Sequence, residues 1–132
     1  MVSGISVALS GYHAATTRLD VAASNIANQA STQSADQNGR TVNTPYVPLQ
    51  VVQSSNSGNG VTTSTKPVSP ASVRQYDPTN PAANAQGIVQ APNVDLAQQL
   101  ISADIAGYDA KANLKSIRVQ NEMFRQALDI IS

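Results

Sequence analysis

Residues that could do chemistry are few in this 132-residue chain, and their spacing forms no recognisable site. His13 is the only histidine and there is no cysteine, which excludes disulfide frameworks and thiolate metal sites. Because His13 has no carboxylate cluster nearby, we expect it on a helix surface or in packing, and not as a base or a metal ligand. The sequence therefore predicts no catalytic residue, no metal ion and no cofactor.

The acidic residues lead to the same conclusion. Acid/base chemistry needs carboxyl groups held close together, and the acids of the C-terminal segment are spaced so that they spread around a helix. There is no phosphate-binding glycine loop, no zinc-ligand spacing and no nucleophile elbow. We therefore expect no enzyme and no small-molecule substrate. The acidic residues in question are Asp77, Asp95, Asp104, Asp109, Glu122 and Asp129.

The composition limits the partners and the size of the core. The formal net charge is zero and 12% of the residues are charged, so no electrostatic attraction to nucleic acid or anionic lipid is expected. No apolar run approaches the ~18 residues that span a membrane. Val, Ile, Leu and Phe make up little more than a fifth of the chain, which predicts a thin core. No cleavable signal peptide is expected, because the first basic residue is Arg18.

Helical periodicity is strongest from Asn93 to Ser132, which we predict to be one long amphipathic helix. Apolar or small residues recur every three or four positions over five heptads, and we expect this row to be a packing seam. A second apolar row beside it makes the apolar surface wider than one partner helix covers. The first row is Leu96, Leu100, Ala103, Gly107, Ala110, Leu114, Ile117, Asn121, Phe124, Leu128 and Ile131, and the second is Ile101, Ile105, Tyr108, Ala112, Val119 and Met123.

The N-terminal segment repeats this pattern. A helix of roughly 27 residues is predicted, ending in the amide-rich stretch Ser24–Thr32. Small side chains on its flanks, at Ala8, Ala15, Ala22 and Ala27, favour helix and let neighbouring helices approach closely. Its expected seam is Ile5, Leu9, Tyr12, Thr16, Leu19, Ala23, Ile26 and Ala30.

The segment between the helices, residues 31–92, is rich in Ser, Thr, Asn and Gly and holds all seven prolines, which argues against long helices. Alternation in Tyr46–Gln53 and a β-branched run in Val61–Thr65 predict a small β-hairpin around the turn-forming residues 54–60. Pro48 suits an edge strand. Residues 67–92 have few large apolar side chains, and we expect an extended arm there.

Four polar residues lie at the expected ends of the helices. Asn25 and Asn28 fit either an ordinary helix exit or an assembly contact. Asn93 or Asp95 is the expected N-cap of the C-terminal helix.

Other polar residues lie along the C-terminal helix. Asn121 either fixes the register of a seam or faces water. Three cations recur every seven residues along one flank, which fits a solvated edge or a contact with an acidic helix. They are Lys111, Arg118 and Arg125. Because the large apolar side chains are few, we expect the termini to order fully only when neighbouring copies cover them.

Three blocks of the chain resemble the bacterial flagellar basal-body rod proteins, most closely the proximal-rod FlgC family. The first is the asparagine-rich stretch Ser24–Ser31. The second, which is the most specific, is Tyr76–Val89 with Pro92–Asp95. The third is the C-terminal helix, including Asn113 and Glu122-Met123. The chain departs from the family's usual residues at Asn80, Asn84, Ile88 and Ala110.

The resemblance implies a mainly α fold, in which the long helices of residues 1–30 and 93–132 pack as an antiparallel coiled-coil pair and form one core domain, with residues 31–92 as an extended middle segment. It implies a structural subunit that assembles helically with other rod proteins and with copies of itself. The resulting drive shaft crosses the periplasm, transmits torque and surrounds the export channel. The resemblance also implies export as an unfolded chain through the flagellar type III apparatus, without a cleaved signal peptide.

The assembly interface is expected on the apolar rows of both helices and on the asparagines beside them. Its expected members are Ile5, Leu9, Tyr12, Leu19, Asn25, Ile26, Asn28, Leu96, Leu100, Gly107, Asn113, Leu114, Ile117, Asn121, Phe124 and Leu128. Two alternatives stay open. One is another axial subunit of the rod or hook type, and the other is a soluble adaptor that binds helices through its apolar face.

Overall fold

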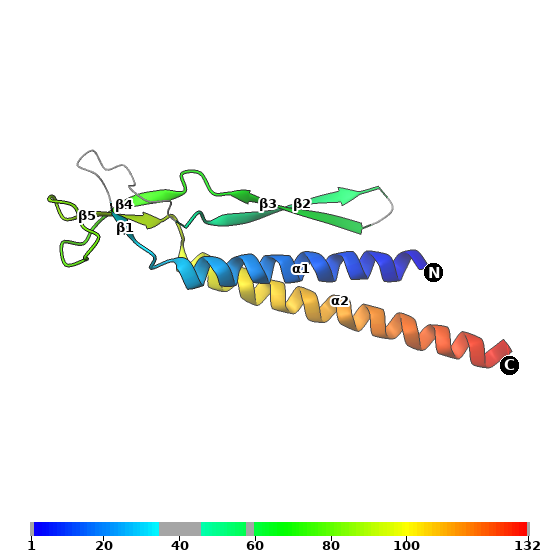
Figure 1. Cartoon of the computed structure of the whole chain (residues 1–132). Helices are drawn as coiled ribbons and strands as arrows, with labels where there is room; N and C mark the ends of the chain where they lie inside the picture. Colours follow the sequence, from blue (N-terminus) through cyan, green and yellow to red (C-terminus); the bar gives the residue numbers. More distant parts are fainter. Residues whose placement is uncertain (1, 35–45, 58–59, 132) are drawn as a thin grey trace. The chain divides into compact units, whose positions relative to one another are not determined.

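The computed structural model describes residues 2–34, 46–57 and 60–131. Two long helices near the ends and antiparallel strands between them agree with the predicted class (Figure 1). The elements are α1 (Val2–Asn28), β1 (Gln33–Ser34), β2 (Leu49–Asn56), β3 (Gly60–Pro67), β4 (Ser72–Tyr76), β5 (Ile88–Pro92) and α2 (Leu96–Ile131). Parts of the predicted middle segment, residues 35–45 and 58–59, and the predicted helix end at Ser132 lie outside the described residues.

The chain divides into two compact units. Unit 1 comprises Met1–Asp20, Val51–Ser64 and Ile101–Ser132. Unit 2 comprises Val21–Gln50 and Thr65–Leu100. Each unit therefore contains part of both helices.

α1 ends where its amide-rich stretch predicts. The Nδ2 of Asn28 donates to the carbonyl of Ser24 at 2.9 Å. The carbonyl of Asn28 accepts from the backbone N of Ser31 at 3.1 Å and from its Oγ at 2.6 Å. Carbonyl groups that have lost their helical partners are thus satisfied locally, and the 27-residue length agrees with the prediction.

α2 begins with an aspartate cap. The Oδ1 of Asp95 accepts a hydrogen bond from the backbone N of Gln98 at 3.1 Å, which is the N-cap geometry. Asn93 does not cap the helix. Its Nδ2 donates to the carbonyl of Pro70 at 2.9 Å, and its backbone N donates to the carbonyl of Ala71 at 3.0 Å. Of the two predicted caps, Asp95 is confirmed.

In unit 1, the two helices contact each other where a glycine faces an amide side chain. A Cβ atom added at Gly4 would lie 2.9 Å from Oε1 of Gln120, and one added at Gly11 would lie 2.6 Å from Oδ1 of Asn113. Residue numbers rise along one helix as they fall along the other, so these contacts run in opposite chain directions. A larger residue at Gly11 would require the facing amide of Asn113 to move.

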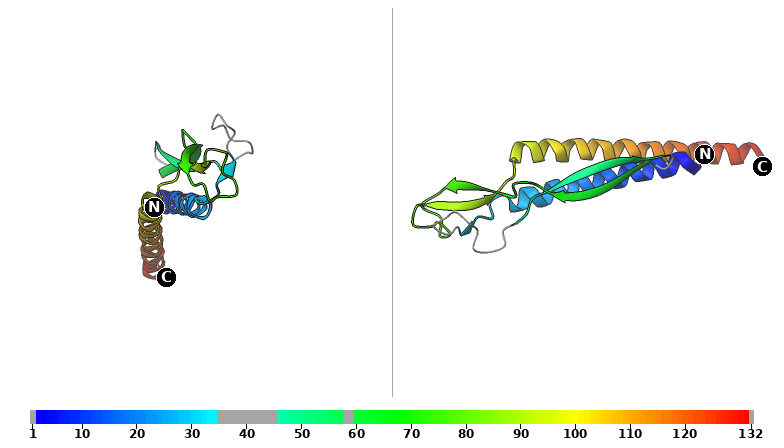
Figure 2. Two further views of the ribbon diagram at one scale, coloured as in Figure 1. Left: turned by 90° about the vertical axis from the view of Figure 1, so that its left-hand side faces the viewer. Right: turned by 90° about the horizontal axis from the view of Figure 1, so that it is seen from above.

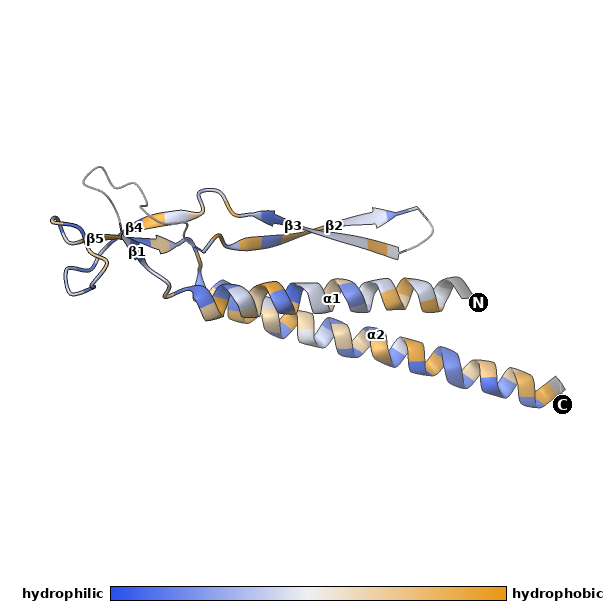
Figure 3. Cartoon of the chain, viewed as in Figure 1, coloured by the Kyte–Doolittle hydropathy of each residue, from blue (hydrophilic) through white to orange (hydrophobic). Residues whose placement is uncertain are grey.

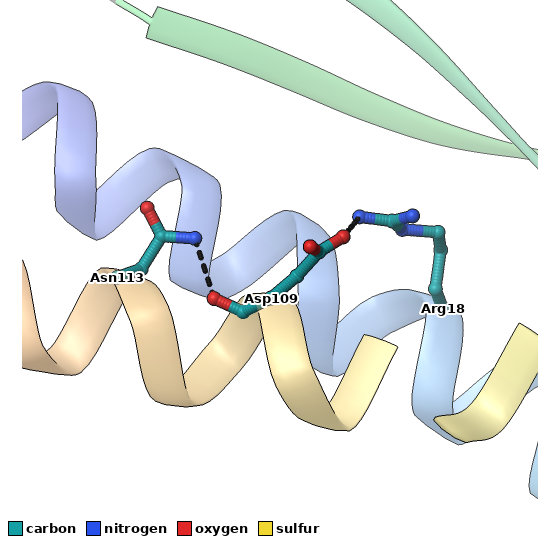
Figure 4. A network of polar contacts seen from close by, with 3 residues as sticks. All are labelled: Arg18, Asp109 and Asn113. Atoms are coloured by element: carbon teal, nitrogen blue, oxygen red, sulfur yellow. Dashed lines mark hydrogen bonds and ion pairs between the residues drawn. The ribbon is translucent and has the colours of Figure 1, made fainter. Parts of the chain in front are cut away.

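One heptad further along α1, the contact becomes an ion pair (Figure 4). The Nη2 of Arg18 donates to Oδ2 of Asp109 at 2.6 Å. The neighbouring amide of Asn113 donates to the carbonyl of Asp109 at 2.8 Å. Because both charged side chains are partly exposed, the pair is expected to add only about 1 kcal/mol, and its main effect is to align the two helices.

The buried row between the helices in unit 1 differs from the predicted seam. Ala8, Ala15 and Ala106 are buried, whereas Leu9 and Leu114 are about half exposed. The large apolar rows, predicted as packing seams, therefore do not form the main contact between these two helices, and their contact with other subunits stays a prediction. The alanines that were predicted on the flank occupy the contact between the helices, because small side chains let the two backbones come close.

The β2–β3 hairpin confirms the predicted one and lies along α1 within unit 1 (Figures 1 and 2). The Oγ of Ser10 accepts from the backbone N of Val61 at 3.0 Å and donates to the carbonyl of Val7 at 2.7 Å. Gly60 adopts a φ of 90°, and a side chain there would overlap Ser10. The hairpin thus rests on the side of α1 next to the α2 contact.

Unit 2 holds a three-stranded antiparallel sheet in the order β1-β5-β4. The central strand pairs Gln90 with Gln33 on one side and with Arg74 on the other. The expected extended arm in residues 67–92 is therefore wrong, since it contributes two strands. The few apolar side chains are concentrated in β5, where Val89 and Ala91 are buried. Hydrogen bonds between the paired strands satisfy the backbone groups of the sheet.

Asparagine side chains hold the loop between β4 and β5. The Nδ2 of Asn80 donates to Oγ1 of Thr32 at 2.9 Å. The Oδ1 of Asn84 accepts from the backbone N of Gln86 at 3.0 Å and of Ile88 at 2.9 Å. Such side-chain bonds replace secondary structure in a loop with little apolar content.

The glycine–amide contact gives a testable prediction. In the wild-type chain, Gly11→Ala is expected to lower the free energy of unfolding by about 1 kcal/mol, because the new Cβ displaces Asn113. In an Asn113→Ala background the same change is expected to raise it by up to about 1 kcal/mol, because alanine is the better helix former. Urea unfolding of the four variants measures the coupling. Equal effects of Gly11→Ala in both backgrounds would show that the contact does not form.

Candidate assembly interface

The predicted interface residues of α1 within unit 1 lie on one flank of the helix. Leu9 and Leu19 are exposed, and Ile5 and Tyr12 are partly buried. Each of these four residues comes directly after a residue that faces α2. One residue of an α-helix corresponds to a turn of about 100°, so the row lies about 100° around the helix from the α2 contact. The row is available for a contact outside the α1–α2 pair.

The first predicted row of α2 has the same offset from the seam. Gly107, Leu114 and Asn121 follow Ala106, Asn113 and Gln120 by one residue. In an antiparallel pair, the two chains turn in opposite directions when both helices are viewed from the same end. A row that lies one residue after the seam in each helix is therefore on the same side of the pair.

The two rows therefore make one apolar face two helices wide, which we call face B. A surface hollow that both Leu19 and Gly107 line agrees with this arrangement. Within unit 1, face B comprises Ile5, Leu9, Tyr12, Leu19, Gly107, Leu114, Asn121 and Leu128.

Other predicted members of the row are shared between face B and the seam. Ile117 and Phe124 are partly buried. In unit 2, Ile26 is partly buried, whereas Leu96 and Leu100 are exposed. The sequence thus identified an apolar row, although α1 covers only part of it.

The second apolar row of α2, which we call face A, is exposed along its length. Its helical positions place it on the opposite flank of α2 from face B. Figure 3 shows hydrophobic residues recurring along the whole helix. Beyond the predicted row, Ile130 is 85% exposed, near the end of α2 that runs past the N-terminus of α1 in Figure 1. The large exposed members of face A are Ile101, Ile105, Tyr108, Val119, Met123 and Ile130.

Asn25 is a buried hydrogen-bonding centre of unit 2. Its Nδ2 donates to the carbonyl of Leu49 at 2.8 Å and to Oε1 of Gln99 at 3.1 Å. Its Oδ1 accepts from the backbone N of Leu49 at 3.1 Å and from the hydroxyl of Tyr46 at 2.9 Å. With 1% of its surface exposed, Asn25 joins α1, α2 and the start of β2 within one chain.

The remaining predicted asparagines differ in their surroundings. Asn28 closes the end of α1 as described above, which is the helix-exit interpretation. Asn113 is partly buried and lies against Gly11. Asn121 is exposed, so it does not fix the α1–α2 register. Contacts of these residues with other subunits stay a prediction.

The cation row lies on the exposed side of α2. Lys111, Arg118 and Arg125 are exposed. The Nζ of Lys111 lies 5.6 Å from the ring centroid of Tyr108, which is within the range of a cation–π contact. The solvated-edge interpretation fits this exposure.

One carboxyl group has a resolved pKa shift. Hydrogen bonds from the Oγ1 of Thr79, which has the largest effect, and from the Nδ2 of Asn80 lower the pKa of Asp77 below its ordinary value. A lowered pKa in the folded state means that the stabilisation is present above the ordinary pKa and is lost as the pH falls through the lowered one. The turn after β4 is therefore fully supported at neutral pH.

Groups that could perform chemistry are not gathered together. His13 is exposed, with its ring 6.0 Å from that of Tyr12. Within the described residues, no three acidic or histidine side chains lie close enough to hold a metal ion. In the described part of the chain, neither helix contains a segment long and apolar enough to cross a membrane.

Sequence reasoning missed the polar side of the seam. The sequence did not predict that Gln99, Gln120, Arg18 and Asp109 make contacts between the helices, because apolar periodicity selects large apolar side chains. A signal was present, since Gly4, Gly11, Arg18 and Asn25 are spaced by seven, as are Gln99, Ala106, Asn113 and Gln120.

No family model matches the chain. The chain is similar to the flagellar basal-body rod protein FlgC of Bacillus subtilis (strain 168), with 31% identity over an alignment of 144 positions that spans 96% of this chain and 95% of the relative. It is similar to the protein of the same name from Escherichia coli O6:H1, with 32% identity covering 94% and 92%. The Aquifex aeolicus FlgC protein is 26% identical, covering 96% and 94%. The likeness thus includes both helices and the segment between them.

Asn25 gives the prediction for this site. Asn25→Ala is expected to lower the free energy of unfolding by about 3 kcal/mol, because buried partners in three other residues lose their hydrogen bonds. The matched control is Asn28→Ala, which removes one exposed side-chain bond and is expected to change it by less than about 1 kcal/mol. Chemical denaturation followed by circular dichroism measures both. Equal losses in the two variants would contradict the role assigned to Asn25.

Proposed function

The chain belongs to the FlgC family of flagellar basal-body rod proteins, and we propose that its two helices perform the family's structural role by packing against neighbouring subunits. Its relatives match it over nearly the whole length. The chain is a structural subunit of the rod, so it assembles with other components of the flagellar basal body. The points that follow concern how it does so.

The observation that carries the proposal is the exposure of the largest apolar side chains. In unit 1, α1 and α2 meet through alanine, glycine and amides, while faces A and B remain exposed. Apolar surface of this extent along a helix is typical of a protein–protein contact. We propose that neighbouring copies and other rod subunits cover these faces in a helical assembly around the export channel.

The same contacts support an antiparallel coiled-coil pair. Gly4 and Gly11 of α1, seven residues apart, face Gln120 and Asn113 of α2, which are also seven apart. A seven-residue repeat is the period of helices that coil around each other. We propose that the pair, within residues 1–30 and 93–132, is the core domain that enters the rod, with residues 31–92 as a separate middle segment.

We propose that the protein works in the periplasmic rod, after export through the flagellar type III apparatus as an unfolded chain. The small core supports this route. The buried apolar residues among those described are mainly alanines, with Val89 and Pro48 as the largest fully buried apolar side chains. Unfolding such a core exposes little apolar surface, so the free energy required is small. We propose no catalytic activity for the chain.

The test is to isolate hook–basal bodies from the bacterium that produces the chain and measure its abundance by mass spectrometry. The wild-type chain is expected in the rod at a fixed ratio to other rod subunits. Leu114→Asp is expected to reduce incorporation at least about tenfold, because a carboxylate on face B would have to lose its water in an apolar contact. Its effect on the isolated chain should stay within about 1 kcal/mol, since Leu114 is exposed.

Arg125→Asp is the matched control, because it places the same carboxylate on the exposed cation row of α2, outside faces A and B. It should incorporate normally. Absence of the wild-type chain from basal bodies that contain other rod subunits, together with its recovery among soluble proteins, would contradict the proposal and favour the helix-binding adaptor.

A further inference from the structure

The glycine–amide contacts of unit 1 follow one register. Gly4 of α1 faces Gln120 of α2. Seven residues further along α1 and seven residues back along α2, Gly11 faces Asn113. A step of one heptad along α1 is thus matched by a step of one heptad in the opposite direction along α2, so the same positions of the repeat meet each time.

The contact between the helices within unit 2 has the same register. Asn25 stands fourteen residues after Gly11, and Gln99 stands fourteen residues before Asn113. The Nδ2 of Asn25 donates to Oε1 of Gln99 at 3.1 Å. This pair therefore meets at a whole number of heptads from the glycine–amide contacts, and we call each such pair of facing positions a layer.

The side chains of each layer are complementary in size or in hydrogen bonding. In the two glycine layers, α1 supplies the small residue and α2 the large one. The next layer is reversed, because Arg18 of α1 is matched with Ala106 of α2, which is completely buried. The Nη2 of Arg18 bonds Asp109, three residues further along α2. The last layer consists of two amides that bond each other.

A slide of α1 by one heptad would break this match in either direction. In one direction, Arg18 would share a layer with Asn113, and Asn25 would lose its bond to Gln99. In the other direction, Arg18 would share a layer with Gln99, and Asn25 would lie beyond the start of α2. Overpacked layers and voids are both destabilising, and so is a buried amide without its partner.

We propose that these four layers select a single register for the pairing of α1 with α2. A seam of leucines repeated every heptad lacks this selectivity, because it packs equally well after a slide. The register also decides which residues of face B lie side by side, since both helices contribute to that face. The selection takes place within each chain and goes beyond the proposed place of the protein in the rod.

The test measures the register in the full-length chain by the distance between two spin labels. The chain has no cysteine, so labels can be attached at His13→Cys in α1 and Glu122→Cys in α2, both at exposed positions of unit 1. A slide of one heptad moves one label by about 10 Å along the helix axis. Double electron–electron resonance, with labelled chain diluted in unlabelled chain, is expected to give one narrow distance distribution for the wild-type seam.

Gly11→Asn is expected to change the register in a defined direction. In the native register the new amide meets Asn113, whereas after a slide of one heptad it would face the small Ala106. A second, longer distance is therefore expected, because this slide carries the α1 label away from the α2 label. The melting temperature is expected to fall by about 5 °C or more.

The double variant Gly11→Asn with Asn113→Gly exchanges the large and the small residue of one layer. It is expected to restore the single distance and at least about half of the lost melting temperature, because the layer is again complementary. Asp20→Asn is the matched control, since it places the same amide at an exposed position of α1 outside the layers. It should leave the distance unchanged.

A distance that Gly11→Asn leaves unchanged would overturn the inference. A broad distribution in the wild-type seam would do the same, and so would a double variant as unstable as the two single changes together. The basal-body measurement is independent of these outcomes, because it asks whether the chain is in the rod and not how its helices are aligned.

Discussion

The close contact between α1 and α2 in unit 1 is the constraint on which the use of the other side chains depends. Glycine opposite an amide, at Gly11 and Asn113, leaves no room for a large apolar residue between the helices. Buried alanines continue that row, and the ion pair of Arg18 with Asp109 aligns it. Such a seam buries little apolar area, so it supplies alignment more than stability.

Most leucines and isoleucines of the two helices are consequently exposed on the flanks of the pair. A chain that buried them internally would gain stability alone and lose the surface for its neighbours. For a rod subunit the division is consistent with its role, because stability then comes with assembly.

Amide side chains replace apolar packing in unit 2. Asn25 satisfies both its donor and its acceptor within the chain, and Asn84 holds the loop before β5. Hydrogen bonds of this kind specify one geometry and need little volume. A protein with few large apolar residues can thus keep its strands and helices in place, and the helix-exit motif at Asn25 has a structural use in each single chain.

The sequence by itself determined both long helices, the hairpin and the Asp95 cap, because periodicity, proline placement and capping are local properties. It also identified the apolar rows, and through the resemblance the family. Only the tertiary structure decided that α1 packs on the α2 row of Ala106, Asn113 and Gln120, which lies one residue before the predicted row. It also decided that residues 72–76 and 88–92 pair as strands. Both depend on which backbones come close, and close approach favours alanine and glycine over leucine, a preference that apolar periodicity does not contain.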